Sequence, residues 1–133
     1  MIWKPLHVYN LEVIPTILTE GSNVKEHIHS FEMQLDMSLK LEPVLVNSHS
    51  SRDVMSIDEQ RQFFREALDM EAQTGIAVAH ETHRSRALST PWRTAQLLQE
   101  FKTLKINADF SHWCCVSESL LAERCKKYNM EVS

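Results

Sequence analysis

Short apolar runs alternate along the chain with longer stretches in which apolar residues recur every three or four positions. The short runs predict β-strands, and the longer periodic stretches predict α-helices. We expect strands at residues 11–18, 43–49, 76–81 and 104–109, the first of them weakened by Pro15, which suits the edge of a sheet. Strands that alternate with helices in this way are typical of a parallel sheet with helices packed on it. The pattern therefore predicts an α/β fold.

The predicted helices carry signals at their ends. A capping box at residues 56–59 predicts a helix that runs to about Thr74, and the pair at 90–91, Thr-Pro, predicts the start of the next. A last helix is expected to begin at Ser117 and to end near Tyr128. The first helix has an apolar face formed by Val24, Ile28, Phe31, Leu35 and Leu39.

Polar residues stand at the ends of three predicted strands. They are His49, Glu81 and Asp109, and they are separated by 32 and 28 residues. An eight-unit (β/α)8 barrel of roughly 250 residues has about 31 residues per unit, so this spacing places the three residues at the carboxyl end of successive strands. Four such units make half a barrel. A partial barrel and a complete, smaller doubly wound domain both remain open on this pattern.

The alternation of side chains along each strand tests whether these residues face one way. Glu81 shares a face with Ala79, whereas the bulky Ile76 and Val78 lie on the other face. By the same count, His49 shares its face with Asn47 and Leu45. Counting from Asp109 gives the same result. Two carboxylates and an imidazole at one rim suit a divalent cation such as Mn²⁺, Mg²⁺, Co²⁺ or Zn²⁺. Without a cation, the two carboxylates should repel and raise the pKa of one of them.

Further residues near the rim are candidates for substrate contacts. His83 shares a face with Glu81 on an extended strand, and the turn after Asp109 brings His112 back over the same rim. Arg84 and Arg86 follow in a polar loop, where an arginine can bind a phosphate or carboxylate.

Other histidines and cysteines are expected to play no part in the chemistry. We interpret His27 and His29 as surface residues. Cys114 and Cys115, next to Trp113, are interpreted as buried packing.

Composition narrows the class of protein. With 133 residues, 43% hydrophobic and 24% charged, the chain is typical of one globular domain spanning 1–133. Three cysteines without a CxxC motif favour a reducing compartment, and no basic leader or membrane-length apolar run is seen, so we expect a cytoplasmic protein. The net charge of −4 with scattered Lys and Arg disfavours nucleic acid as a partner.

Two tetrads together carry a resemblance to a known family. His80-Glu81-Thr82-His83, followed one unit later by Asp109-Phe110-Ser111-His112, with Asn47-Ser48-His49 upstream, resembles the xylose isomerase-like TIM barrels. These include sugar phosphate isomerases and epimerases and are related to the apurinic endonucleases. The resemblance implies that Glu81 and Asp109 bind a metal ion and that His112 contacts substrate or metal. It also matches His49 to a rim histidine.

The resemblance implies a metal-dependent sugar or sugar phosphate isomerase or epimerase. Glu81 and His112 would be catalytic, and His49, His83 and Arg84 would contact the substrate. In the family a further His and Glu come from strands six to eight, so we expect a truncated barrel with open sheet edges through which two copies could form a homodimer. Two alternatives remain: an apurinic endonuclease-like phosphodiesterase, and a non-catalytic fragment or binding paralogue.

Overall fold

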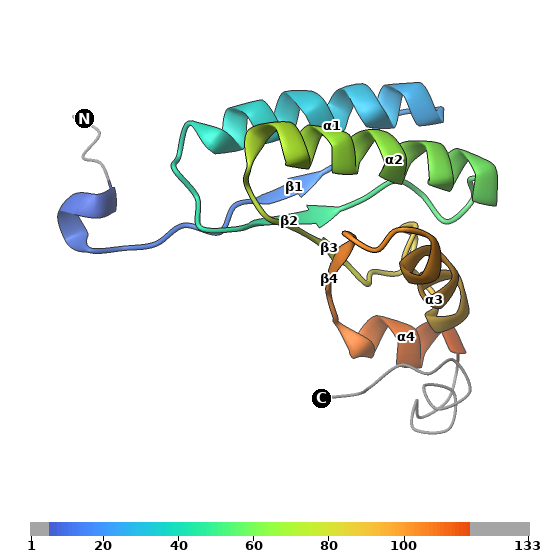
Figure 1. Ribbon diagram of the computed structural model, residues 1–133. Helices are drawn as coiled ribbons and strands as arrows, with labels where there is room; N and C mark the ends of the chain where they lie inside the picture. Colours follow the sequence, from blue (N-terminus) through green and yellow to red (C-terminus); the bar gives the residue numbers. More distant parts are fainter. Residues whose placement is uncertain (1–5, 118–133) are drawn as a thin grey trace.

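A computed structural model describes residues 6–117, in which helices and strands alternate (Figure 1). A short 3-10 helix, η1, precedes the first strand. The elements in chain order are η1 (Leu6–Tyr9), β1 (Thr16–Leu18), α1 (Val24–Leu39), β2 (Val46–His49), α2 (Ile57–Thr74), β3 (Val78–Glu81), α3 (Pro91–Glu100), β4 (Lys105–Asn107) and α4 (Phe110–Ser117).

The four strands form one parallel sheet in the order β1-β2-β3-β4. This confirms the predicted α/β fold and places β1 and β4 at the two edges. Each strand is shorter than predicted. β1 begins after Pro15, which has no N–H to donate but whose carbonyl oxygen accepts a hydrogen bond from the Asn47 amide at 2.9 Å. β4 ends at Asn107, so Asp109 lies in the turn that follows it.

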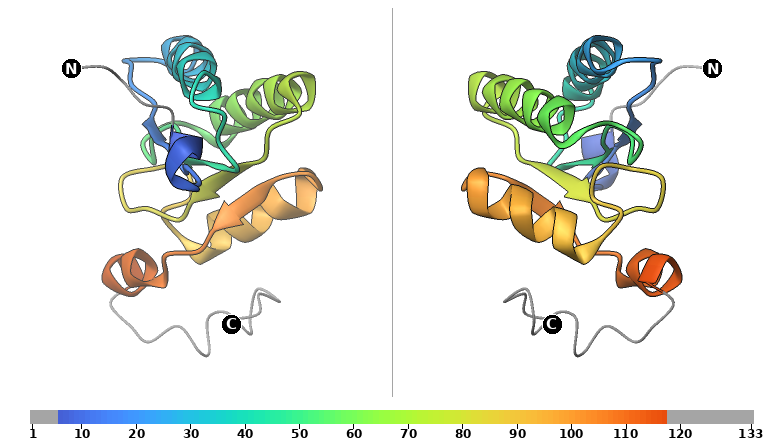
Figure 2. Two further views of the ribbon diagram at one scale, coloured as in Figure 1. Left: turned by 90° about the vertical axis from the view of Figure 1, so that its left-hand side faces the viewer. Right: turned by 90° about the vertical axis from the view of Figure 1, so that its right-hand side faces the viewer.

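One face of the sheet carries the hydrophobic core. Ile17, Val46 and Val78 point to this face from β1, β2 and β3, and helices α1 and α2 lie side by side over it (Figures 1 and 2). The residues that pack against the strands there are Phe31, Leu35, Phe63, Phe64 and Leu97. The period of two along the strands leaves the polar residues of the rim on the opposite face.

The helix boundaries follow the predicted signals closely, with one exception. Ser56 and Glu59 form the capping box at the start of α2, and Thr90 caps α3. The exception is α4, which begins at Phe110 rather than at Ser117 because the Asp109 carboxylate accepts a hydrogen bond from the Ser111 amide and so supports an earlier start. The rest of the helix predicted from Ser117 to Tyr128 lies outside the described residues.

The outer edge of β1 is occupied by a side chain of α1. The Leu18 amide donates to Gln34 Oε1 at 3.0 Å, and Gln34 Nε2 donates to the Leu18 carbonyl oxygen at 2.7 Å. A primary amide therefore takes the place that the peptide group of a neighbouring strand would take. This pairing blunts the open edge of the sheet at Leu18.

Two predictions about buried and exposed residues were wrong. His27 is 1% exposed, because the loop after β1 folds over it and brings Thr19 Oγ1 within 2.9 Å of Nδ1. Cys114 packs against the buried Trp113 but is only partly buried itself, and Cys115, the next residue of the short helix α4, is exposed. His29 is exposed, as predicted.

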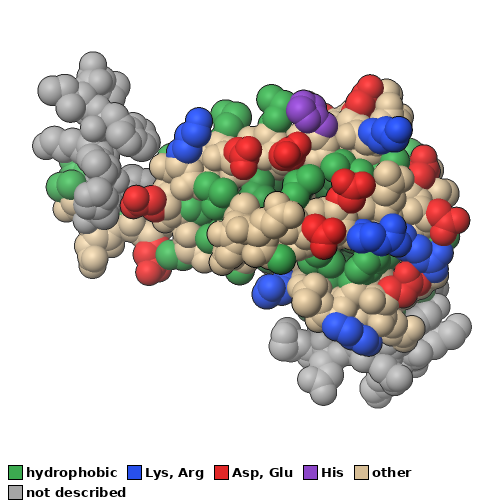
Figure 3. Space-filling view, turned by 45° about the horizontal axis from the view of Figure 1, so that its top comes forward, with side chains coloured by type: hydrophobic (Ala, Val, Ile, Leu, Met, Phe, Trp, Pro, Cys, Tyr) green, Lys and Arg blue, Asp and Glu red, His purple; other side chains and the backbone are tan. Residues whose placement is uncertain are grey.

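The surface formed by α1 and α2 carries Asp, Glu, Lys and Arg side chains interspersed with one another (Figure 3). This face has no large block of one charge sign. Within residues 6–117, no helix combines the length and apolar character that crossing a membrane requires.

Candidate functional site

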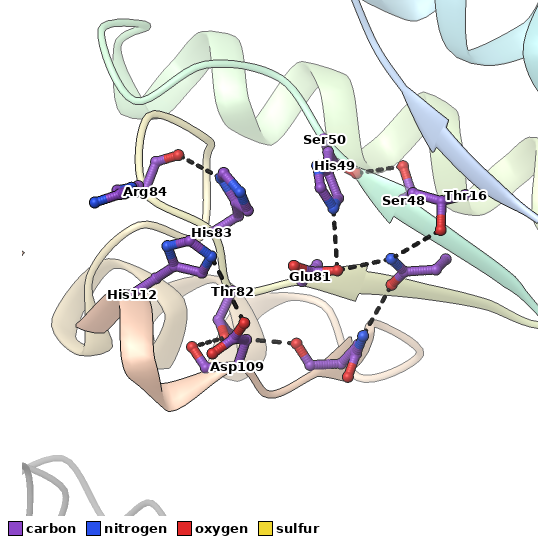
Figure 4. Close-up of polar contacts among 12 residues, drawn as sticks. Thr16, Ser48, His49, Ser50, Glu81, Thr82, His83, Arg84, Asp109 and His112 are labelled. Carbon is purple, nitrogen blue, oxygen red and sulfur yellow. Dashed lines mark hydrogen bonds and ion pairs between the residues drawn. The ribbon is translucent and has the colours of Figure 1, made fainter. Parts of the chain in front are cut away.

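Glu81, the last residue of β3, lies at the centre of a polar cluster at the carboxyl end of the sheet (Figure 4). Its side chain is 13% exposed. Asn47 Nδ2 donates to Glu81 Oε2 at 2.7 Å, and His49 Nε2 lies 3.0 Å from the same oxygen. Both donors come from β2, so the carboxylate is oriented by the neighbouring strand.

A second asparagine extends this cluster to β4. Asn107 Nδ2 donates to Asn47 Oδ1 at 3.1 Å, and Asn47 Nδ2 also lies 3.5 Å from Thr16 Oγ1. These contacts assign the two ends of the Asn47 amide, its oxygen toward Asn107 and its nitrogen toward Glu81. Sequence reasoning placed both asparagines on the site face but gave them no role. Their alternation with His49 and Asp109 was the signal that could have found them.

Asp109 approaches the cluster from the turn after β4, and His112 approaches it from the first turn of α4. The pKa of Asp109 is lowered, chiefly because the Ser111 hydroxyl donates a hydrogen bond to the carboxylate, with the Ser111 amide adding to the effect. The rise expected from carboxylate repulsion is therefore not found at Asp109. His112 Nε2 lies 3.6 Å from Asp109 Oδ2. Burial and the neighbouring His83 lower the pKa of His112, which favours its neutral, metal-binding form.

Three imidazole rings form a row across the mouth of the site. The ring centroids of His49 and His83 are 4.6 Å apart, and those of His83 and His112 are 3.9 Å apart. His83 Nδ1 donates to the Arg84 carbonyl oxygen at 2.6 Å (Figure 4). When neutral, His83 therefore keeps its lone pair on Nε2, as expected of a histidine that serves as a ligand.

The ligand-type atoms of this region fall into two groups that share Glu81. One group is His49, Glu81 and His83, and the other is Glu81, Asp109 and His112; within each group the atoms lie within 4.8 Å of one another. Two carboxylates with an imidazole, or one carboxylate with two, match the ligand preferences of a divalent cation of intermediate hardness. The residues present thus fit a metal ion.

The structure separates the two arginines. Arg84 is exposed beside the histidine row and contributes its carbonyl oxygen to His83. The Arg86 guanidinium turns instead to the backbone, donating through Nη1 to the carbonyl oxygens of Thr19 at 2.7 Å and Ser51 at 3.2 Å. Arg86 therefore connects loops at the rim.

Comparisons with known proteins bear on the fold. No protein-family model matches the chain, and no curated protein matches it. Among solved structures, the probable 3-DHS dehydratase AsbF of Bacillus anthracis, which is involved in petrobactin synthesis, superposes with a TM-score of 0.65 at 19% identity. The match covers 93% of this chain and 49% of AsbF, so the chain spans about half the length of that protein. The four βα units of this chain therefore share the fold of part of a TIM barrel.

Proposed function

We propose that this chain provides the Glu81 rim of a divalent-metal-dependent isomerase or epimerase that acts on a sugar or sugar phosphate. The observation that carries the proposal is the position of Glu81, which belongs to both groups of ligand-type atoms and accepts hydrogen bonds from β2. The fold shared with a TIM barrel supports it, because the active sites of such barrels lie at the carboxyl ends of the strands.

Glu81, Asp109 and His112 would hold the cation. Bound there, Mn²⁺, Mg²⁺, Co²⁺ or Zn²⁺ would polarise substrate oxygens and make a neighbouring proton more acidic. His112 is suited to this role because its lowered pKa keeps the imidazole neutral and able to bind. His112 is also proposed to contact a substrate oxygen.

Glu81 is the group proposed to accept and return the proton. Asn47 and His49 both donate to Oε2, whereas Oε1 accepts no hydrogen bond from the described residues. The carboxylate is thus held through one oxygen while the other is available to a substrate or cation. A general base must be positioned in this way within reach of the proton that it removes.

The mouth of the site would bind the polar part of the substrate. His49, His83 and Arg84 are the candidates, since imidazole nitrogens can hydrogen-bond hydroxyl groups and a guanidinium can bind a phosphate. The positive charge of Arg84 reaches the site: after burial and His83, it contributes to the lowered pKa of His112.

A dehydratase is the second candidate, and the similarity to AsbF favours it. Elimination of water next to a carbonyl group begins, like isomerisation and epimerisation, with removal of a proton from the adjacent carbon. Glu81 would act as the base in either reaction, and the fate of the resulting carbanion would decide between them.

Deuterium exchange tests this proposal without requiring a complete turnover. The protein would be incubated in D₂O with Mn²⁺ and a panel of ketoses, ketose phosphates and hydroxy-ketone acids, and ¹H NMR would follow loss of the proton next to the carbonyl. We expect exchange with at least one substrate class, abolished in Glu81→Gln and retained in the exposed control Glu32→Gln. Absence of exchange across the panel at saturating Mn²⁺, or exchange that survives Glu81→Gln, would contradict the proposal.

A further inference from the structure

Four buried polar side chains form a hydrogen-bonded chain on the face of the sheet opposite the site. It consists of Ser48 from β2, Ser50 directly after β2, His80 from β3 and Glu71 from α2. His80 and Ser48 are 0% exposed, Ser50 is 2% exposed and Glu71 is 6% exposed. None of the four has a role in the proposed chemistry, although His80 and Ser48 stand next to residues that do.

The contacts within this hydrogen-bonded chain are short, and each side chain contacts the next. His80 Nε2 lies 2.7 Å from Glu71 Oε1, and His80 Nδ1 lies 2.6 Å from Ser50 Oγ, which lies 2.8 Å from Ser48 Oγ. A carboxylate only accepts hydrogen bonds, so Nε2 carries the proton of a neutral His80 and Nδ1 accepts from the Ser50 hydroxyl. Ser48 then donates to Ser50. Each proton in the chain has one place, and each has an acceptor.

The surroundings exclude a direct catalytic role. The ring of Phe31 stacks on His80 with a centroid distance of 6.0 Å, and the ring of Phe64 meets it edge-on at 5.2 Å. Although Ser50, His80 and Glu71 resemble the order of groups in a hydrolytic triad, the serine and the histidine are enclosed by the core and cannot meet a substrate. Any effect of the hydrogen-bonded chain on the chemistry must therefore pass through other residues.

The members of the hydrogen-bonded chain that lie at the ends of β2 and β3 alternate in the sequence with residues of the site. Ser48 stands between Asn47 and His49, Ser50 follows His49, and His80 precedes Glu81. Successive side chains on a strand point to opposite faces, so a contact that locks one face also sets the position of the other. The buried contact from Ser50 to His80 and the site contact from His49 to Glu81 join the same two strand ends from opposite sides.

We propose that His80 is a positioning residue that holds Glu81 in reach of Asn47 and His49 by linking β3 to β2 through Ser50 and to α2 through Glu71. This proposal rests on the proposed function, in which Glu81 binds the metal ion and moves the proton and so has to be held in place. Hydrophobic packing alone would also bury this face, but it would tolerate small displacements of one strand along the other. The hydrogen-bonded chain tolerates them poorly, because a shift leaves the Glu71 carboxylate buried without a partner.

The test needs a variant that removes the hydrogen-bonded chain without leaving a buried charge. The double variant Glu71→Leu/His80→Leu replaces both partners with apolar side chains, and such exchanges of both partners of a buried hydrogen bond often preserve folding. Ser50→Ala breaks the link to β2 alone. Thr94→Val is the matched control, since Thr94 is a fully buried residue of α3 whose hydroxyl donates to the Thr90 carbonyl oxygen, within its own helix turn.

Two readouts separate positioning from stability. Mn²⁺ affinity, followed by the electron paramagnetic resonance of free Mn²⁺, is expected to fall about 10-fold or more in the double variant, as when groups that orient a ligand are lost. The imidazole signals of His49 in long-range ¹H–¹⁵N NMR, recorded without metal, are expected to shift because its bond to Glu81 is disturbed. Ser50→Ala should move both readouts in the same direction, and Thr94→Val neither.

The outcomes decide the two proposals independently. A folded double variant with unchanged His49 signals and unchanged Mn²⁺ affinity would overturn the positioning role of His80. If the double variant does not fold, the Ser50→Ala variant decides, and unchanged His49 signals in it overturn the role as well. Failure of the unaltered protein to bind Mn²⁺ would count against the proposed function, and the His49 signals would still judge the positioning.

Discussion

Asn107 on β4 donates a hydrogen bond of 3.1 Å to Asn47 on β2, across the full width of β3. Ala79 makes this possible. It pairs with Asn47 in the strand register, and its methyl group leaves room above β3 for the two amides to meet. The orientation of Glu81 therefore depends on a small residue that carries no chemistry of its own.

Enlarging Ala79 should uncouple the two asparagines. In Ala79→Leu, a branched side chain would occupy the space between β2 and β4, so Asn47 would lose its contact with Asn107 and its fixed orientation toward Glu81. We expect a loss of about 1 to 3 kcal/mol in the free energy of unfolding and weaker Mn²⁺ binding, measured by urea denaturation and metal titration. Ala77→Leu, on the same face but farther from the site, is the control and should leave Mn²⁺ binding unchanged. Equal binding by both variants would argue against the role of Ala79.

Metal binding should be weak and should depend on both carboxylates. Glu81, Asp109 and His112 supply three ligands, so we expect Mn²⁺ or Zn²⁺ to raise the melting temperature only at roughly millimolar concentration, by the stabilisation that ligand binding to the folded state provides. Glu81→Gln and Asp109→Asn should each abolish the shift in differential scanning fluorimetry. Tight binding that persists in both variants would place the ion elsewhere.

Folding stability should fall in mild acid because of His27. Burial is the main cause of its lowered pKa, so His27 takes up a proton at a lower pH in the folded protein than in the unfolded chain, where it does so near pH 6.5. Its contribution to stability is complete above pH 6.5 and is lost as the pH falls through that value toward the lower folded pKa. Thermal melts of His27→Gln between pH 7.5 and pH 5 should show a shallower dependence than the parent. The exposed His29→Gln should follow the parent, and an unchanged slope in His27→Gln would contradict the assignment.

Removing the amide that covers the β1 edge should promote self-association. Gln34→Ala frees the Leu18 amide and carbonyl groups, which then offer strand-pairing positions to a second copy. Light scattering after size-exclusion chromatography should show more dimer or larger species than the parent at the same concentration. Gln73→Ala, an exposed glutamine of α2, should behave like the parent. A monomeric Gln34→Ala protein would show that this edge does not govern association.

The strands and the rim could be read from the sequence because each depends on local pattern. The alternation of Val78, Ala79 and Glu81 separates the core face from the site face, and parallel strands bring their carboxyl ends to one edge. His80 is an exception to this alternation, because it is a polar residue on the core face and the sequence did not indicate its burial. Its partners Glu71 and Ser50 lie 9 and 30 residues away, and nothing in the sequence pairs them.

The burial of His27 was missed for a related reason. Its position near the start of α1 gives no apolar signal, and its environment is created by Thr19, in a loop that meets it only in the folded chain. Asp109 was placed correctly at the rim but in the wrong element. The turn that holds it depends on Ser111, whose hydroxyl and amide both bind the carboxylate, and no strand periodicity reports such a contact.

The guanidinium of Arg86 has a consequence for how the rim can move. From the loop after β3 it reaches the carbonyl oxygen of Thr19, in the loop after β1, and that of Ser51, in the loop after β2. The Arg86 side chain therefore joins three loops. The loop after β1 or the loop after β2 cannot move outward without breaking its hydrogen bond to Arg86, and the loop after β3 cannot do so without breaking both. Admission of a substrate would be a concerted motion of the three loops, and their amide protons should exchange with solvent as one cooperative group.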